Sequence, residues 1–328
     1  MRAAYYETFG APEDVLIIGE VDTPTPGPGE VLVRLTHSGV NPSDAKSRAG
    51  TRPGVTKPDF PRIIPHSDGA GTIFAVGEGV DPARMDQHVW IWNAQWQRAH
   101  GTAAEMIALP ADQAVPLPEG VSHEVGATLG IPGLTACQTV FGGGEVAGQT
   151  LLISGGAGAV GHMAVQLAKW GGATVITTAS ADAADYVADT GADHVLDYRD
   201  DDLTAKIKDI APGGIDRAVE VEFGTNAALL AEVMKPLGTI ATYGSAKDMT
   251  PELPFGAMLF KALKIDISLI YILPPAERAA AIARLHAALT EGALKPAIHA
   301  CLPLADCVTA HNMVLSPGRR GAVLLETV

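Results

Sequence analysis

Three glycines at fixed spacing are the residues of this sequence that point most directly to chemistry. Gly156, Gly158 and Gly161 form the pattern G-x-G-x-x-G within the stretch LLISGGAGAVGHMAVQLAKW. Between a strand and a helix, such glycines allow a tight turn, a close approach of the backbone to a pyrophosphate, and close packing of the helix on the strand. The N-terminus of the helix would offer its N–H groups to the phosphates. The pattern therefore predicts a dinucleotide site, and the alternative is a turn with a purely structural role.

The end of the next apolar run bears on which dinucleotide is bound. An NAD site usually places Asp or Glu there, where the carboxylate accepts a hydrogen bond from the ribose 2′-hydroxyl. Here the run TVITT ends at Thr178, Ala179 and Ser180. A 2′-phosphate would meet no carboxylate, and Ser180 could donate a hydrogen bond to it. We therefore expect NADP rather than NAD, the alternative being a surface turn that contacts nothing.

Strands and helices alternate from about residue 122 onwards, as a glycine loop of this kind requires. The expected strands are 150–154, 173–179, 194–198, 215–222 and 239–244, and the expected helices are 159–171, 182–191, 202–214 and 226–238. This alternation predicts an α/β fold with a doubly wound parallel sheet. Ser122 is expected to cap a helix over 123–130, and Gly292 to close a helix that begins at residue 277.

The first ~120 residues have a different character, being rich in Pro and Gly with short alternating runs. In VLVRLT, the residues Val31, Val33 and Leu35 fall on one face of a strand, with Leu32 against the pattern. These features predict a compact, mostly antiparallel β domain. We expect one domain over 1–121 and a second over 122–262, with 263–328 adding a last strand and then returning to the first domain.

Composition limits the class of partner. The 328 residues are 47% hydrophobic and 18% charged, which is typical of a globular chain long enough for two domains. The 37 acidic and 23 basic residues give a net charge of −14, which disfavours nucleic acid and anionic membranes as partners. The three cysteines do not form a Cys-x-x-Cys pair, and the sequence shows neither a signal-peptide pattern nor an apolar run of membrane-spanning length. These features predict a cytoplasmic protein.

Several stretches resemble the medium-chain dehydrogenase/reductase superfamily, in its zinc-free quinone oxidoreductase (zeta-crystallin-like) branch. They are SGVNPSDAKSRAG, PHSDGAGTIFAVGEGV, GATLGIPGLTA, SGGAGAVG, LDYRDDDL, MKPLGTIATYGS, LTEGALKP and AHNMVLSPGRRG, in family order. The resemblance implies a GroES-like β domain followed by a Rossmann domain. It also implies NADP as the cofactor, a quinone or enone as the small electrophilic substrate, and a homodimer.

The same resemblance implies the cofactor-binding residues. The pyrophosphate should lie against Ala157, Gly158, Ala159 and Val160, the 2′-phosphate should face Ser180, and Tyr198 should pack on the adenine. The nicotinamide side should be lined by Asn226, Tyr243, Gly244, Ser245, Ser268 and Leu269, with Asn41 and Thr135 bordering the reacting ring. Lys46 replaces a common Tyr and could reach a cofactor phosphate or ribose, or point into solvent. Tyr198 could instead be an ordinary exposed tyrosine, and Asn226 a helix N-cap.

No metal is expected. By the resemblance, Asn41 and Ser67 stand where zinc-dependent relatives carry ligands, and His66 lies one place away. No Ser-His-Asp set or carboxylate pair is found, so no catalytic acid is assigned. The expected function is NADPH-dependent, zinc-independent reduction of quinones by hydride transfer. The alternatives are reduction of enal or enone double bonds, and an NADPH-binding structural or regulatory protein with little turnover.

The segment LKIDISLIY, residues 263–271, bears on assembly. Leu263, Ile265, Ile267 and Leu269 alternate with polar residues, which predicts a half-buried strand at the edge of the parallel sheet. Exposed sheet edges tend to be paired or covered. By the resemblance, this edge should pair with a second copy of the chain.

Overall fold

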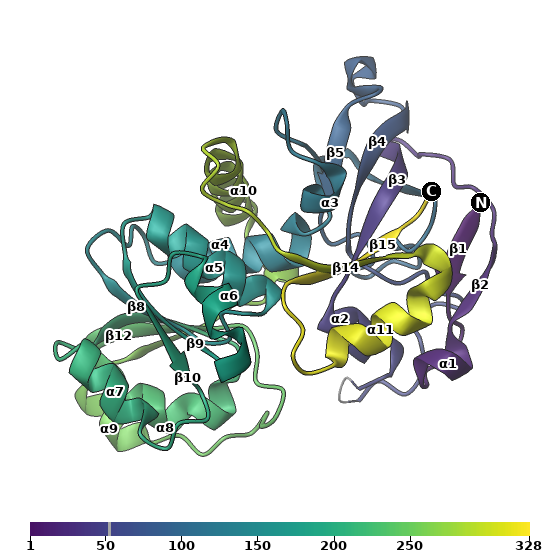
Figure 1. Ribbon diagram of the computed structural model, residues 1–328. Coiled ribbons are helices and arrows are strands. Elements are labelled where there is room, and N and C mark those ends of the chain that lie inside the picture. Colours follow the sequence, from purple (N-terminus) through teal and green to yellow (C-terminus); the bar gives the residue numbers. More distant parts are fainter. Residues whose placement is uncertain (52–53) are drawn as a thin grey trace. The chain divides into compact units, whose positions relative to one another are not determined.

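The computed structural model describes residues 1–51 and 54–328, which divide into two compact units (Figure 1). Unit 1 comprises Met1–Ile131 and Pro296–Val328, and unit 2 comprises Pro132–Lys295. The first boundary falls later than the expected residue 121, because the Ile131 N–H donates to the carboxylate of Asp68 in unit 1 at 2.8 Å. The second falls after residue 262, because the strand and helix that follow pair with and pack on elements of unit 2.

Unit 1 is built mainly from antiparallel strands, as expected. Its strands are β1 (Arg2–Tyr5), β2 (Ile17–Glu20), β3 (Glu30–Val40), β4 (Asp68–Val76), β5 (His88–Ile91), β6 (Met106–Pro110), β7 (Ala114–Pro116), β14 (Ile298–Pro303) and β15 (Ala322–Glu326). Its helices and short helical turns are α1 (Pro12–Val15), α2 (Pro42–Arg48), η1 (Pro82–Arg84), η2 (Ala111–Gln113), α3 (His123–Gly126), η6 (Leu304–Asp306) and α11 (Cys307–Leu315). The large sheet has the order β14–β15–β3–β4–β5–β7, with β6 on β3, and only its β14–β15 pair is parallel.

Strand β3 shows how the apolar pattern builds the core of unit 1. Val31, Val33 and Leu35 are fully buried, as their alternation predicts. Leu32, which breaks the alternation, is only 5% exposed. Both faces of this part of β3 are therefore covered, and the strand fixes the position of Asn41, which directly follows its last residue.

Unit 2 is a parallel sheet with helices on both faces. Its strands are β8 (Thr150–Ile153), β9 (Thr174–Ala179), β10 (His194–Asp197), β11 (Ile215–Glu220), β12 (Met234–Thr242) and β13 (Lys264–Ile267). Its helices and helical turns are α4 (Leu134–Phe141), α5 (Ala159–Trp170), η4 (Ala181–Ala183), α6 (Ala184–Ala188), α7 (Leu203–Ile210), α8 (Phe223–Val233), α9 (Phe255–Phe260), η5 (Ile270–Ile272) and α10 (Pro275–Thr290). Within unit 2, α4, α5 and α6 cover one face of the sheet and α7, α8 and α9 the other (Figure 1).

The strand order of unit 2 is β10–β9–β8–β11–β12–β13, and every pair is parallel. This is the doubly wound order in which ligands bind outside the carboxyl ends of the strands, at the point where the order reverses. Here the reversal lies between β8 and β11. The loop after β8, which carries the three glycines, therefore stands at the expected binding edge.

Several expected helices differ from the structure in their limits, and two of them show the physical cause. Ser122 caps α3 as predicted, accepting the Val125 N–H at 3.3 Å, but the helix ends at Gly126 and is followed by the π-helical turn η3 (Leu129–Gly133). The helix expected over 226–238 starts earlier and stops at Val233. Pro236 has no N–H to donate and disfavours continuation of the helix, so the chain passes directly into β12.

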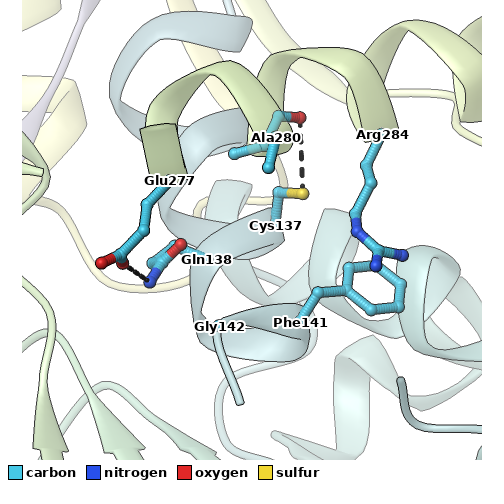
Figure 2. Close-up of a pocket in the computed structure, with 8 residues that line it drawn as sticks. Cys137, Gln138, Phe141, Gly142, Glu277, Ala280 and Arg284 are labelled. Atoms are coloured by element: carbon cyan, nitrogen blue, oxygen red, sulfur yellow. Dashed lines mark hydrogen bonds between the residues drawn. The ribbon is translucent and has the colours of Figure 1, made fainter. Parts of the chain in front are cut away.

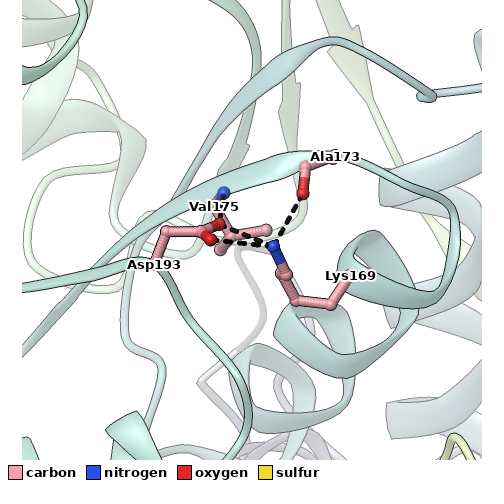
Figure 3. A network of polar contacts seen from close by, with 4 residues as sticks. All are labelled: Lys169, Ala173, Val175 and Asp193. Atoms are coloured by element: carbon pink, nitrogen blue, oxygen red, sulfur yellow. Dashed lines mark hydrogen bonds and ion pairs between the residues drawn. The ribbon is translucent and has the colours of Figure 1, made fainter.

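A polar network fixes the start of β9 against the end of α5 (Figure 3). Lys169 Nζ donates to Asp193 Oδ2 at 2.7 Å and to the Ala173 carbonyl at 3.1 Å. Asp193 Oδ2 also accepts the Val175 N–H at 2.7 Å. The network sits at the amino end of β9, so it holds the helix and strand together away from the carboxyl edge and leaves the glycine loop unobstructed.

Candidate cofactor site

The three glycines of the loop between β8 and α5 are required for different structural reasons. A Cβ on Gly156 would lie 2.4 Å from Thr177 Oγ1, and one on Gly161 would lie 2.2 Å from the Gly155 carbonyl oxygen. Packing therefore requires both of these glycines. A Cβ on Gly158 would meet nothing nearer than the Gly155 oxygen at 3.4 Å, an ordinary contact. Gly158 is thus the glycine whose missing side chain leaves room for a ligand.

The N-terminus of α5 supplies hydrogen-bond donors at this place. Its N-cap is Gly158, which has no side chain to cap the first N–H groups. The helix dipole adds a partial positive charge at the same end. Ala157, Gly158, Ala159 and Val160 are each half-buried, so a ligand can reach their backbone. The loop fits a pyrophosphate without any further residue.

The ends of β9 and β10 lie side by side along the same edge. The Tyr198 N–H donates to the Ala179 carbonyl at 3.2 Å, which places Tyr198 next to the strand end that leads into Ser180. Tyr198 is 49% exposed and Ser180 is half-buried. The structure therefore brings together the two residues expected to face the adenine and the 2′-phosphate.

Two charged residues at this edge were not expected from the sequence. The Arg199 guanidinium lies 5.0 Å from the centre of the Tyr198 ring, and Arg199 Nη2 donates to Tyr198 Oη at 3.0 Å. Asp197 Oδ2 accepts the Ala181 N–H at 3.2 Å, and its Oδ1 accepts the Arg199 N–H at 2.9 Å. The motif LDYRDDDL contains Asp197 and Arg199 on either side of Tyr198. Their positions next to Tyr198 could have indicated from the sequence that they lie at this edge.

The carboxyl ends of β11, β12 and β13 continue this edge beyond β8. The Tyr243 N–H donates to the Glu220 carbonyl at 3.1 Å, and the Ser268 N–H donates to the Thr242 carbonyl at 2.8 Å. Ser245 Oγ accepts the Gly224 N–H at 2.8 Å. Tyr243, Gly244, Ser245 and Ser268 are half-buried, and Leu269 is 48% exposed. The expected nicotinamide-side residues after β12 and β13 therefore share one edge.

Asn226 is not the N-cap of a helix, which was one of the two interpretations of this residue. Helix α8 begins at Phe223 and its N-cap is Glu222, so the interpretation of Asn226 as an N-cap is wrong. Asn226 Nδ2 donates to Glu220 Oε1 at 3.1 Å, and the same oxygen accepts the Glu222 N–H at 2.5 Å. Burial raises the pKa of Glu220. Glu220, which the sequence pattern did not single out, thus holds the start of α8 at the carboxyl end of β11.

In unit 1, Asn41 is held by two buried carboxylates. Asn41 is 6% exposed, and its Nδ2 donates to Asp68 Oδ2 at 2.7 Å. Its backbone N–H donates to Asp44 Oδ2 at 2.8 Å, which caps the start of α2. Burial raises the pKa of Asp44 to about 7, and burial together with the Asp44 charge raises the pKa of Asp68 well above its usual range. The Asn41 amide therefore has a fixed orientation, with one N–H on Asp68 and one left to donate elsewhere.

Lys46 and Thr135 are the two remaining expected residues. Lys46 is exposed on α2, so both of its interpretations stay open. Thr135 lies in α4 and is 5% exposed. Its carbonyl accepts the Thr139 hydroxyl at 2.7 Å.

The residues at the family's zinc-ligand positions do not fit zinc. Asn41 presents an amide that is already bonded to Asp68. Ser67 is 2% exposed, and a neutral hydroxyl is a poor replacement for the imidazole or thiolate that Zn²⁺ prefers. No step of the reaction is therefore derived through a metal at this place.

A hollow of about 170 Å³ lies between α4 and α10 in unit 2 (Figure 2). Cys137 Sγ donates to the Ala281 carbonyl at 3.5 Å, and Gln138 Nε2 donates to Glu277 Oε2 at 2.9 Å. Burial raises the pKa of Cys137 to about 12, so this thiol is not a nucleophile. The polar groups bond to one another, and the hollow is a helix–helix junction rather than a reaction site.

Comparison with known proteins decides the family. Residues 27–119 match a family described as alcohol dehydrogenase GroES-like domain, and residues 159–287 match one described as zinc-binding dehydrogenase. The quinone oxidoreductase of Rattus norvegicus is 31% identical over 330 residues, which cover 99% of this chain and 97% of that protein. The chain belongs to the medium-chain dehydrogenase/reductase superfamily, in its quinone oxidoreductase-like branch. The expected family is thereby confirmed.

Other relatives of this dehydrogenase/reductase differ in their names and lengths. The synaptic vesicle membrane protein VAT-1 homolog of Homo sapiens is 33% identical over 231 residues, or 69% of this chain. The aligned part is 56% of that protein, so the chain spans little more than half its length. No helix in the described part of the chain is both long and apolar enough to cross a bilayer.

Solved structures confirm the fold class of a GroES-like domain combined with a Rossmann domain. An NAD-dependent alcohol dehydrogenase superposes with a TM-score of 0.91 at 27% identity, over 100% of both chains. A mycobacterial protein solved in complex with NADPH superposes with a TM-score of 0.87 at 28% identity, over 99% of this chain and 100% of that one. These neighbours support a nicotinamide cofactor for this chain.

Proposed function

We propose that this protein is an NAD(P)-dependent oxidoreductase and, more narrowly, an NADPH-dependent reductase of quinones that needs no catalytic zinc. The observation that carries the proposal is the cofactor edge of unit 2. It combines an uncapped helix N-terminus with Ser180 at the end of β9, where an NAD site would have a carboxylate, and with Arg199 beside Tyr198 after β10. The full-length match to quinone oxidoreductases supports the choice of substrate.

Each part of the cofactor would have its own residues. Ala157–Val160 and the α5 N-terminus would hold the pyrophosphate, Ser180 and Arg199 the 2′-phosphate, and Tyr198 the adenine face. Asn226, Tyr243–Ser245, Ser268 and Leu269 would line the nicotinamide side. Bound NADPH supplies the hydride, and the protein supplies position and polarity.

Asn41 and Thr135 are proposed as the hydrogen-bond donors to the substrate. A quinone that accepts a hydride becomes an oxyanion, and donors aimed at that oxygen lower the barrier. The bond from Asn41 to Asp68 fixes the amide before substrate arrives, so the remaining N–H needs no reorientation. Because the Asn41 amide and the Ser67 hydroxyl do not fit zinc, no Lewis acid is proposed at the reacting ring, and the substrate must already be electrophilic.

Two other functions have specific support. Enals and enones are also electrophilic and would use the same donors, so reduction of their double bonds is the first alternative. The second is an NADPH-binding structural or regulatory protein with little turnover, which the name of the VAT-1 homolog relatives favours. NADPH oxidation measured with a quinone, an enal and no acceptor separates the three.

We expect NADPH to bind more tightly than NADH. Arg199→Ala should weaken NADPH binding about three- to tenfold and leave NADH binding unchanged, because an exposed charge-assisted hydrogen bond is worth roughly 1 kcal/mol. Ser180→Asp should shift the preference of the protein towards NADH relative to the wild type, because the new carboxylate would repel the 2′-phosphate. Fluorescence titration with both cofactors measures the two affinities.

Lys264→Ala, an exposed charge change on β13, serves as the control. Equal affinities for NADPH and NADH in the wild type would contradict the assignment.

We expect a homodimer formed through unit 2. Strand β13 lies at the sheet edge as predicted, but Ile267 is 77% exposed rather than half-buried. Phe255, Leu259 and Phe260 on α9 are 67%, 56% and 90% exposed. Exposure of such a set of apolar side chains to water is unfavourable, and it marks an interface that a partner covers.

Light scattering tests this assembly. The wild type should show twice the mass of one chain, and Phe260→Glu combined with Ile267→Lys should show a single chain. Leu315→Glu, an exposed apolar residue of unit 1, should leave the dimer intact. A wild-type monomer, or a dimer that survives the double substitution, would show that this face is not the interface.

A further inference from the structure

Three residues that could ligate a metal meet in the core of unit 1, in a place separate from the family's catalytic zinc positions. His66, Cys307 and His311 are all fully buried. One ligand atom from each lies within 4.8 Å of the other two. Cys307 and His311 are four residues apart on α11 and therefore share one face of that helix. His66 reaches them from the loop directly before β4.

The hydrogen bonds around His66 determine which of its nitrogens carries the proton. Thr102 Oγ1 must donate to the Asp68 carbonyl, at 2.5 Å, because a carbonyl only accepts. Ser38 Oγ must then donate to Thr102 Oγ1, at 2.8 Å, and can only accept from His66 Nδ1, at 2.9 Å. His66 is therefore protonated on Nδ1, and its Nε2 lone pair points at His311 Nε2, 2.9 Å away. A ligating histidine in proteins is oriented in this way, by a hydrogen bond from its other nitrogen.

His311 completes the pair but leaves a polar atom unused. Its Nδ1 is buried without a hydrogen-bond partner in the described chain. The two Nε2 atoms are satisfied by the hydrogen bond between them, and Nδ1 of His311 would carry the ring proton when its Nε2 ligates a metal.

The backbone of His66 is also unusual. Its φ of 78° lies in the left-handed region, which a non-glycine residue rarely adopts. A strained, fully buried, polar residue persists only when its surroundings compensate for its cost, and such residues gather at functional sites. An imidazole that ligates a metal would provide this compensation.

We propose that His66, Cys307 and His311 bind a zinc ion that fastens α11, and with it the C-terminal return of the chain, to the loop before β4. Nitrogen and thiolate are ligand types that Zn²⁺ prefers, and these three residues supply three of the four positions of a tetrahedral ion. Ligand nitrogens about 2.0–2.1 Å from a tetrahedral ion stand about 3.3 Å apart, so the two rings need to separate by only a few tenths of an ångström. This site revises the expectation that the protein holds no metal, and it leaves the proposed reduction unchanged.

The charges near the site act on the Cys307 thiol in opposite directions. Burial and the buried Asp44 carboxyl raise the pKa of Cys307 to about 12, and the Arg48 guanidinium lowers it. Binding of zinc would release the thiol proton of Cys307. The thiolate would then offset one charge of the ion next to Arg48, which a third neutral histidine would not do.

Because the site is buried, the ion must enter as the chain folds, so the test loads the metal during expression. The full chain and its variants are produced in zinc-supplemented medium, passed over a chelating column and measured by elemental analysis. We expect one zinc per chain in the wild type and in Cys301→Ser, which removes an exposed thiol. We expect about tenfold less zinc in Cys307→Ser and in His66→Asn, which tolerates the left-handed backbone.

Cobalt in place of zinc gives a second, spectroscopic measurement. Protein expressed with cobalt should show a thiolate-to-cobalt charge-transfer band in the wild type and in Cys301→Ser but not in Cys307→Ser. This wild-type band keeps the proposal testable even if a variant fails to fold. A wild type without zinc or the cobalt band, or a zinc content that is the same in all folded variants, would overturn the proposal and leave a metal-free histidine pair.

Discussion

Replacing Asn41 by alanine should lower the turnover of a quinone about 100-fold and leave the affinity for NADPH within about twofold. The amide is 6% exposed and fixed on Asp68, so its remaining N–H is a preorganised donor. The oxyanion that this N–H would stabilise exists mainly in the transition state, so kcat should fall and cofactor binding should not. Steady-state kinetics and a fluorescence titration measure the two quantities.

The same substitution also has a structural cost that must be measured. Without the amide, the buried Asp68 carboxyl keeps only its bond from the Ile131 N–H, which destabilises unit 1 by roughly 1–3 kcal/mol. Asn93→Gly removes another buried amide of unit 1 at a residue with a φ of 51°, and it should lower stability without a comparable loss of turnover. If Asn41→Ala retains wild-type turnover, Asn41 is not a donor to the substrate.

Replacing Gly158 by alanine should weaken NADPH binding at least about tenfold while the thermal stability stays close to that of the wild type. The protein itself has room for the new Cβ, whose nearest neighbour would be the Gly155 oxygen at 3.4 Å. The φ of Gly158 is −76°, which alanine adopts without strain. The methyl group would therefore disturb only a ligand that lies against the loop.

Two other glycines serve as comparisons for this prediction. Gly161→Ala would place Cβ 2.2 Å from the Gly155 carbonyl oxygen, so it should lower stability as well as binding. Gly213→Ala meets no atom within 4 Å and should change neither. Gly158→Ala with unchanged NADPH affinity would mean that the loop is only a structural turn, the alternative that the sequence left open.

Much of unit 2 could be predicted because its signals are local. Apolar runs, the glycine loop and the alternation of strands and helices determine the parallel sheet, and the carboxyl ends of parallel strands meet at one edge. Ser180 was therefore assigned to this edge from its position after a strand, whereas Tyr198 and Tyr243 were assigned to the cofactor site from the family resemblance. The helix limits near Pro132 and Pro236 were missed, because the assignment followed apolar periodicity and gave too little weight to the prolines.

Other features depend on contacts between distant parts of the chain and have no local pattern. The bond between Asn41 and Asp68 joins residues 27 positions apart, and the pair His66 and His311 joins residues 245 positions apart. The sequence shows Asp68 only as part of a family motif, and His66 only as a residue one place from a ligand position. Exposure of Ile267 was missed for a related reason, since alternation predicts which residues share a face but not whether anything covers that face.

The most direct test of the proposed function is NADPH oxidation by the purified protein with three acceptors, together with ethanol oxidation by NADP⁺, under the same conditions. A simple quinone should be reduced fastest and a conjugated enal more slowly, because both delocalise the incoming charge. Acetone should not be reduced, nor should ethanol be oxidised with NADP⁺, because neither is activated without a Lewis acid. Turnover of acetone or ethanol as fast as that of any quinone would contradict zinc-independent quinone reduction.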